Sequence, residues 1–168
     1  MIKLHHIAVV ITASTLSFQA HAGEPITKLK TAPHFISSDA YGKVLVGQND
    51  LALYTFKKDA KLGSYPPKCT NKPDDKPLSS CLKRWPAATI STRHFYKLLQ
   101  ANPKAPYGAV YNPDIHKLQL TYEGLPLYYW FKDNAKKGSN FTGLGIKQAW
   151  GLKSQDKDIG FDGTVTDK

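Results

Sequence analysis

The chain has 168 residues and a formal net charge of +10 at pH 7, with two cysteines and one methionine. That length is typical of one domain that buries a substantial core. No Cys-x-x-Cys-His motif occurs, which excludes covalent c-type haem, and the two cysteines do not have the Cys-x-x-Cys spacing of a redox-active pair.

The first 22 residues have the pattern of a cleaved secretory signal. Lys3 gives a positive start, residues 7–18 are mostly apolar, and Ala20 and Ala22 are the small residues that a signal peptidase reads, so cleavage is expected before Gly23. The apolar stretch is shorter than the roughly 20 residues that a membrane span needs. No cysteine stands at the cleavage site to carry a lipid anchor. We therefore expect a periplasmic or secreted protein without a transmembrane segment after cleavage.

One segment of the remaining chain occurs twice. Residues 51–64 read LALYTFKKDAKLGS and residues 125–139 read LPLYYWFKDNAKKGS, so the copies begin 74 residues apart and differ by one inserted residue. Each copy follows a run with strand character, at residues 42–47 and 116–122, and a turn signal separates each run from its copy. Strand, tight turn and strand in this order predict a β-hairpin in each copy.

The fold expected from this repeat is mainly β. We predict two related β-hairpin units with an internal pseudo-twofold relation, packed as one small domain, with one short helix between them. The domain is placed at residues 23–152, with the repeats at about 42–86 and 116–150. Residues 153–168 are polar and are expected to form a frayed C-terminal tail.

Alternation along the strands assigns side chains to faces. In the first copy Tyr54 and Phe56 point to one face and Leu53 to the other, and in the second copy Tyr128 and Trp130 alternate with their apolar neighbours. Because both faces are apolar, we expect each hairpin to be covered on both sides. The two units are expected to pack their sheets together around the aromatic residues.

The helix is predicted between the two units, at residues 91–102. Phe95, Leu98 and Leu99 have helical spacing, and Ser91 is a suitable N-cap.

An aspartate ends the strand of each copy, just before a loop that contains lysine and glycine. These residues are Asp59 and Asp133. Aspartate in this position commonly accepts hydrogen bonds from backbone N–H groups of the following turn, so a structural role is predicted, with a catalytic or metal-binding role as the alternative. The neighbouring lysines are expected to keep both carboxyl groups ionised.

The two cysteines are predicted to form a structural disulfide. Cys69 and Cys81 enclose eleven residues rich in proline, aspartate and serine, and an oxidising compartment favours the bond. Closing a loop of this size stabilises a fold by roughly 3 kcal/mol in the chain-entropy model.

Positive charge is concentrated between residues 57 and 97, where ten lysines and arginines stand against three aspartates. Such an excess attracts anionic partners, although a solvated face that only aids solubility has the same composition. We expect a basic face that binds an anionic polymer or an acidic protein. Its candidate binding residues are Lys57, Lys58, Lys83, Arg84, Arg93 and Lys97.

No arrangement of residues predicts catalysis. His34, His94 and His116 lie in separate segments without metal-site spacing, and the sequence has no Gly-x-Ser-x-Gly motif and no phosphate-binding glycine loop. We therefore expect no catalytic residue, no metal and no cofactor. The predicted function is an exported module that binds an anionic envelope component or partner, nucleic acid being the less expected anion. The alternative is a periplasmic redox- or metal-associated accessory protein that uses tyrosine, tryptophan, histidine and the cysteine pair.

These motifs resemble a family of secreted repeats and predicted lipoproteins marked by Tyr-x-aromatic-x-x-Asp. Both copies have the motif, as YTFKKD at residues 54–59 and YYWFKD at residues 128–133, which makes Tyr54, Phe56, Asp59, Tyr128, Trp130 and Asp133 the repeat-motif residues. The resemblance covers about residues 42–152. The chain departs from the family in the insert between its cysteines and in lacking a lipobox cysteine. The resemblance implies the compartment and the fold, and it implies no activity, since the family is of uncharacterised function.

The signal peptide gives a direct prediction. Protein recovered after export should begin at Gly23, and its intact mass should lack residues 1–22. Retention of Met1 in the exported protein would contradict the secretory interpretation.

Overall fold

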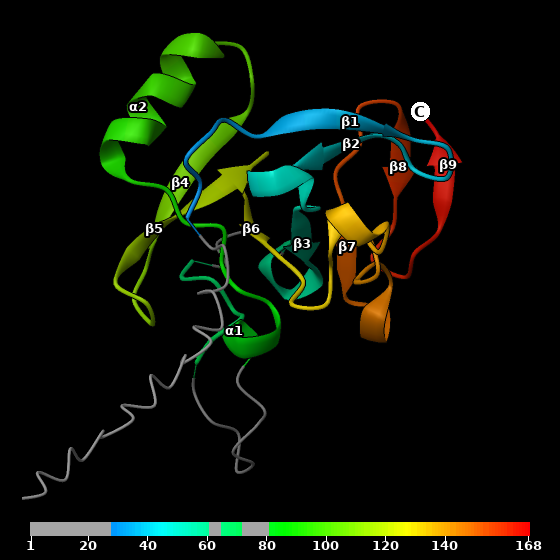
Figure 1. Ribbon diagram of the computed structural model, residues 1–168. Coiled ribbons are helices and arrows are strands. Elements are labelled where there is room, and N and C mark those ends of the chain that lie inside the picture. Colours follow the sequence, from blue (N-terminus) through cyan, green and yellow to red (C-terminus); the bar gives the residue numbers. More distant parts are fainter. Residues whose placement is uncertain (1–27, 61–64, 72–80) are drawn as a thin grey trace, which may run out of the picture.

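The computed structural model describes residues 28–60, 65–71 and 81–168 (Figure 1). The predicted signal peptide and most of the loop between the cysteines lie outside these residues. The elements in chain order are β1 (His34–Ser38), β2 (Gly42–Val46), η1 (Gln48–Asp50), β3 (Tyr54–Phe56), η2 (Lys57–Ala60), α1 (Cys81–Arg84), α2 (Thr92–Ala101), β4 (Tyr107–Asn112), β5 (Lys117–Tyr122), β6 (Leu125–Tyr128), η3 (Ala135–Lys137), η4 (Ile146–Gln148), β7 (Trp150–Leu152), β8 (Lys157–Ile159) and β9 (Val165–Asp167). The prediction of a mainly β fold is confirmed.

One antiparallel sheet joins strands from both copies. Its strand order is β4-β5-β6-β3-β7, so β3 of the first copy and β6 of the second lie side by side, with Tyr54 opposite Tyr128. Two further sheets, β1-β2 and β8-β9, have two strands each. The sequence had predicted that the sheets of the two units pack face to face, and this prediction is wrong. They join edge to edge, because β3 and β6 each hydrogen-bond to the other copy.

Both copies turn where predicted, but only the second forms the predicted hairpin within one sheet, because in the first copy β2 pairs with β1 while β3 pairs with β6 and β7. Between β5 and β6, Glu123 and Gly124 have φ of 51° and 76°, the signs that a two-residue hairpin of type I′ needs at its central positions. In the first copy Asn49 and Asp50 have φ of 55° and 58°, and the Gly47 N–H donates to the Leu51 carbonyl across the turn.

Side chains divide between two apolar cores, one on each face of the central strands. Tyr54, Phe56, Tyr128 and Trp130 belong to one core with the other tryptophans. The second core contains leucines from the central strands, from β5 and from α2, namely Leu53, Leu98, Leu120 and Leu127. The predicted face assignment is confirmed.

The predicted helix is present as α2. Its N-cap is Ser91, whose side-chain oxygen accepts a hydrogen bond from the His94 N–H, and its buried residue Leu98 faces the second core. A second helix, the four-residue α1, follows the cysteine loop and was not predicted, because four residues show no periodicity.

The C-terminal segment is ordered, which corrects the frayed tail predicted for residues 153–168. It forms the β8-β9 hairpin, at the opposite end of the molecule from α2 (Figure 1). Its first residues pair with β2: the Leu45 N–H donates to the Lys153 carbonyl, and the Gln155 N–H donates to the Lys43 carbonyl. The Asp156 carboxylate also accepts from the Lys43 N–H at 2.7 Å. Backbone pairing therefore orders a segment whose polar side chains predicted disorder.

Candidate functional site

The tyrosine of each repeat motif is hydrogen-bonded to the aspartate of the other copy. The Tyr54 hydroxyl donates to Asp133 Oδ2 at 2.6 Å, and the Tyr128 hydroxyl donates to Asp59 Oδ2 at 2.8 Å. Both tyrosines are fully buried, and Asp59 is 4% exposed. The sequence had predicted turn bonds for the aspartates, and the bonds between the copies were not foreseen.

The second oxygen of each aspartate binds the backbone nine residues further along the chain. Asp59 Oδ1 accepts from the Lys68 N–H at 2.7 Å, and Asp133 Oδ1 accepts from the Thr142 N–H at 2.9 Å. The Thr142 hydroxyl adds a bond to the same oxygen of Asp133. Each carboxyl group therefore fixes a loop of its own copy and a tyrosine of the other.

Burial raises the pKa of both aspartates above the ordinary carboxyl value, and the hydrogen bonds that each accepts lower it by less. Burial is also the largest cause of the raised pKa of Tyr54 and Tyr128, followed by the charge of the bonded aspartate. Neighbouring lysines are therefore not the main influence on the pKa of either aspartate. Only the charge of Lys68 contributes, at Asp59, and it is a minor cause there.

Four aromatic rings form a stack between the copies. Trp85 and Trp150 lie face to face, with ring centroids 3.6 Å apart and planes at 7°. Phe56 stacks on the other side of Trp150 at 4.4 Å, and Trp130 lies against Trp85 at 4.2 Å. The order of the rings is Phe56, Trp150, Trp85 and Trp130, so rings of the first and second copies alternate along the stack.

Gly143 gives the stack the space that it needs. A Cβ atom at this position would lie 2.7 Å from a ring carbon of Trp85 and 3.0 Å from the Trp130 side chain, closer than atoms in contact approach. The Gly143 N–H also donates to the Tyr54 hydroxyl at 3.1 Å. Glycine is therefore required here by the close approach of backbone and rings.

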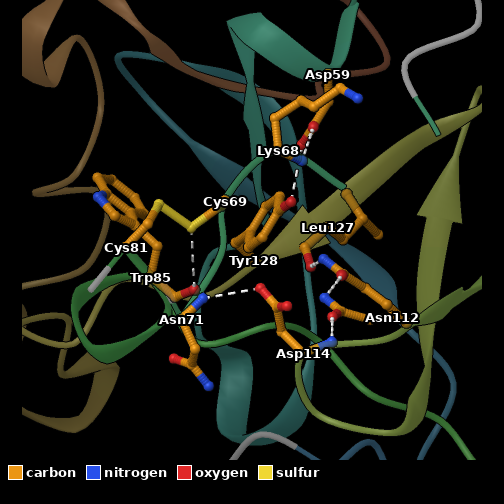
Figure 2. The surroundings of a disulfide bond; sticks show 11 residues. Asp59, Lys68, Cys69, Asn71, Cys81, Trp85, Asn112, Asp114, Leu127 and Tyr128 are labelled. Atoms are coloured by element: carbon orange, nitrogen blue, oxygen red, sulfur yellow. Dashed lines mark hydrogen bonds between the residues drawn. A yellow bond between two sulfur atoms is a disulfide. The ribbon is translucent and has the colours of Figure 1, made fainter. Parts of the chain in front are cut away.

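The predicted disulfide joins Cys69 to Cys81 and holds Trp85 in place (Figure 2). Cys69 directly follows Lys68, which binds Asp59, and Cys81 begins α1, which leads into Trp85. The backbone N–H of Trp85 donates to the Cys81 carbonyl at 2.8 Å. The disulfide thus ties the segment held by Asp59 to the turn that carries the tryptophan.

An open pocket of about 380 Å³ lies beside the stack. Its apolar wall is made by Phe56, Trp85, Trp130 and Trp150, with Ile146, Ala149 and Cys81 around them. Three exposed cationic side chains complete the lining: Lys58, Arg84 and Lys147. No carboxylate lines the pocket, and none in the described part of the chain forms an ion pair with these three cations.

The predicted basic residues do not gather in one place. Lys58 and Arg84 share the aromatic pocket, whereas Lys83 lines a neighbouring hollow together with Lys117. Lys97 lines a third hollow beside α2.

The other two candidates lie outside these hollows. Lys57 is exposed and lies close enough to Asp162 to lower the pKa of that carboxyl group, which accepts its main hydrogen bonds from Thr164. Arg93 is exposed in the first turn of α2.

Sequence analysis missed Lys147, because it lies fifty residues beyond the basic segment. Its backbone is in the left-handed region, with φ of 52° and ψ of 25° inside η4. That conformation costs a non-glycine residue roughly 1–2 kcal/mol, so the surrounding turn holds Lys147 at the pocket rim against a local preference. Its position three residues before Trp150 was the one available signal.

The three histidines have different partners. The His34 ring is 3.0 Å from Asp50, the His94 ring contacts the Ser91 hydroxyl, and the His116 ring contacts the Tyr111 hydroxyl. Among the residues that the structure describes, no three His, Cys, Asp or Glu side chains form a group that could hold a metal ion. Within the same residues, no helix is both long and apolar enough to cross a membrane.

Comparison with known families assigns the second copy. Residues 112–151, from the end of β4 into β7, match a family model described as a secreted repeat of unknown function. The second copy is thus similar to that secreted repeat. The match confirms the predicted resemblance over this segment, and the secreted repeat includes Tyr128, Trp130, Asp133 and Trp150. No curated protein matches the chain, and no solved structure does so.

Tyr54→Phe and Tyr128→Phe should each lower the free energy of unfolding by about 2 kcal/mol, because each removes a hydrogen bond from a buried hydroxyl to a carboxyl group. The two variants should cost similar amounts, since the two tyrosines have equivalent partners. Urea denaturation followed by circular dichroism measures the change. Tyr96→Phe is the matched control, because Tyr96 is 63% exposed, and its effect should stay within about 0.5 kcal/mol. Losses of control size in both variants would contradict a structural role for the pairs.

The raised pKa of Asp59 predicts the sign of a pH effect. In the window that extends upward from the ordinary value of 3.8 to the raised folded value, the folded protein binds more protons at Asp59 than the unfolded chain does. This contribution to stability is therefore present at low pH and is lost as pH rises through the folded pKa. Measured against Asp59→Asn at each pH, the stability difference of wild type over variant should fall from pH 4 upward and then level off.

Asp156→Asn supplies a control of opposite sign. A hydrogen bond from the Lys43 N–H lowers the pKa of the exposed Asp156, so the stability that it contributes should be lost as pH falls through that lowered pKa. A difference for Asp59 that grows with pH would show that hydrogen bonds, rather than burial, set its ionisation.

Proposed function

We propose that this protein is an exported binding module that engages an anionic envelope component or partner through cations around the aromatic pocket. One observation carries the proposal: Lys58, Arg84 and Lys147 share one hollow without a carboxylate partner in the described chain. Three like charges beside a low-dielectric aromatic wall produce a local positive field, and such a field concentrates anions.

The pocket takes its lining from both copies, and this supports a further part of the proposal. Lys58 and Trp85 come from the first copy, whereas Trp130 and Lys147 come from the second. We propose that the copies are two related units with a pseudo-twofold relation, which their reciprocal Tyr–Asp bonds support. In this proposal the ligand site exists only where the two units meet.

Binding is favoured over catalysis by the groups that line the pocket. Asp59 and Asp133 are the two carboxyl groups for which the sequence left a catalytic role as the alternative. Both bind tyrosine hydroxyls and backbone groups, and neither lines the pocket. The pocket offers cations, rings and N–H groups, which hold an anion without a group suited to take its proton. Export to the periplasm or beyond is proposed from the signal pattern and agrees with the secreted repeat.

Retention on phosphocellulose tests the proposal. Wild-type protein should bind at low salt and elute as salt rises, because phosphate contacts release counterions. The variant with Lys58→Glu, Arg84→Glu and Lys147→Glu should elute at clearly lower salt. The matched control changes the same number of charges at exposed lysines outside the pocket, namely Lys30→Glu, Lys104→Glu and Lys117→Glu. Equal shifts in the two triple variants would show that only net charge matters and would contradict the proposed site.

A further inference from the structure

The chain has three tryptophans, and all of them line the pocket. Trp150 is stacked between Phe56 and Trp85, and the other face of Trp85 lies against Trp130, whose plane is tilted by 34°. Neighbouring rings therefore cover both faces of Trp85 and Trp150. The parts of these two rings that remain for a ligand are their edges.

The indole N–H groups have no hydrogen-bond acceptor within the described chain. Trp85, Trp130 and Trp150 are only 4%, 9% and 3% exposed, and none of their ring nitrogens is bonded to a described residue. No described side-chain nitrogen is both fully buried and unpaired, so these N–H groups lie where solvent or a ligand reaches them. Buried indoles usually find an acceptor, and here none of the described residues supplies one.

Ring edges and cations select the same kind of ligand. The edge of an aromatic ring is electropositive and its face is electronegative, so edges attract either an anion or the face of another ring. A sugar or an aliphatic group that packs on an open indole face would find the faces of Trp85 and Trp150 covered. A flat aromatic ring can instead lie across the edges of the stack, with an acidic group directed at Arg84, Lys58 and Lys147.

The size of the pocket limits the ligand to a small group. About 380 Å³ is near the lower end of the range for small-molecule sites, so it admits one ring system with its acidic substituent. A polymer would have to place one such group in the pocket and run outside it.

We infer that the pocket binds a planar aromatic anion, either a free aromatic acid or an aromatic acid group at the end of a larger molecule. This inference rests on the proposed function, because the same three cations hold the ligand. It adds that the ring of the ligand, in contact with the edges of the tryptophan stack, contributes as much to selection as the charge does.

Calorimetric titration with three related compounds tests the ligand class. 2-Naphthoate has both the ring and the charge, 2-naphthamide has the ring alone, and cyclohexanecarboxylate has the charge without the aromatic ring. We expect 2-naphthoate to bind at least tenfold more tightly than either of the others. Equal affinity for the two carboxylates would overturn the inference, and so would equal affinity for naphthoate and naphthamide.

The three indole N–H signals in a ¹H–¹⁵N correlation spectrum report the location of binding. 2-Naphthoate should shift indole signals at concentrations that match the calorimetric titration. Arg84→Gln and Lys147→Gln should each weaken binding about tenfold, the scale of one lost charge-assisted bond, whereas Lys104→Gln should leave it unchanged. Binding of 2-naphthoate that leaves all three indole signals in place would overturn the assignment to this pocket.

The two proposals fail in different ways. If the pocket variant loses retention on phosphocellulose while 2-naphthoate does not bind, the pocket binds anions in general and only the aromatic ligand class is wrong. If neither experiment depends on Lys58, Arg84 and Lys147, the proposed function itself is wrong. Binding to 2-naphthoate that is equally strong in the Arg84→Gln and Lys104→Gln variants would remove the role of the cations.

Discussion

Two hydrogen bonds donated by buried tyrosines, Tyr54 to Asp133 and Tyr128 to Asp59, determine how the two copies can be combined. Leaving a buried hydroxyl or carboxyl group without a hydrogen-bond partner destabilises the folded state about as much as a typical destabilising mutation does. Each copy contributes a tyrosine hydroxyl that donates to the aspartate of the other copy, and an aspartate that accepts from the tyrosine of the other copy. Neither copy can therefore complete its core alone, and the register of β3 against β6 is fixed where Tyr54 faces Tyr128.

The tryptophan stack and the pocket follow from that register. With β3 and β6 adjacent, Phe56 and Trp130 lie on the same face of the sheet and receive Trp150 and Trp85 from the opposite copies. The stack in turn brings together the segments before Trp85 and Trp150. Arg84 and Lys147 belong to these segments, so the position of the cations at the pocket is a consequence of how the core is closed.

Local patterns in the sequence were sufficient for the strands of the two repeats (β2, β3, β5 and β6), the turn at Gly124, the helix capped by Ser91 and the disulfide. These features depend on alternation, spacing or turn residues within short segments, so they can be predicted from each segment alone. The pairing of Tyr54 with Asp133 was not predictable, because a repeat shows that two segments are alike and does not show that they exchange partners. Charge counting along the chain selected Lys58 and Arg84, which line the aromatic pocket, together with Lys97, which lines a different hollow, because density along the chain is not density in space. The tail after residue 152 was misjudged because its order comes from backbone bonds to β2, which polar side chains do not reveal.

The two copies connect their aspartate-bound loop to their tryptophan by different means. In the second copy seven positions lead from Gly143 to Trp150, and the Gly145 N–H donates to the Trp150 carbonyl to close that path. In the first copy sixteen positions lead from Cys69 to Trp85, and the disulfide spans twelve of them. An open loop loses more conformational entropy on folding as it grows, whereas a loop already closed by a covalent bond is closed in the unfolded chain as well. The conformational entropy lost on folding when Trp85 is positioned therefore depends little on the length of the segment between the cysteines. Insertions in this segment are accordingly expected to leave the core undisturbed.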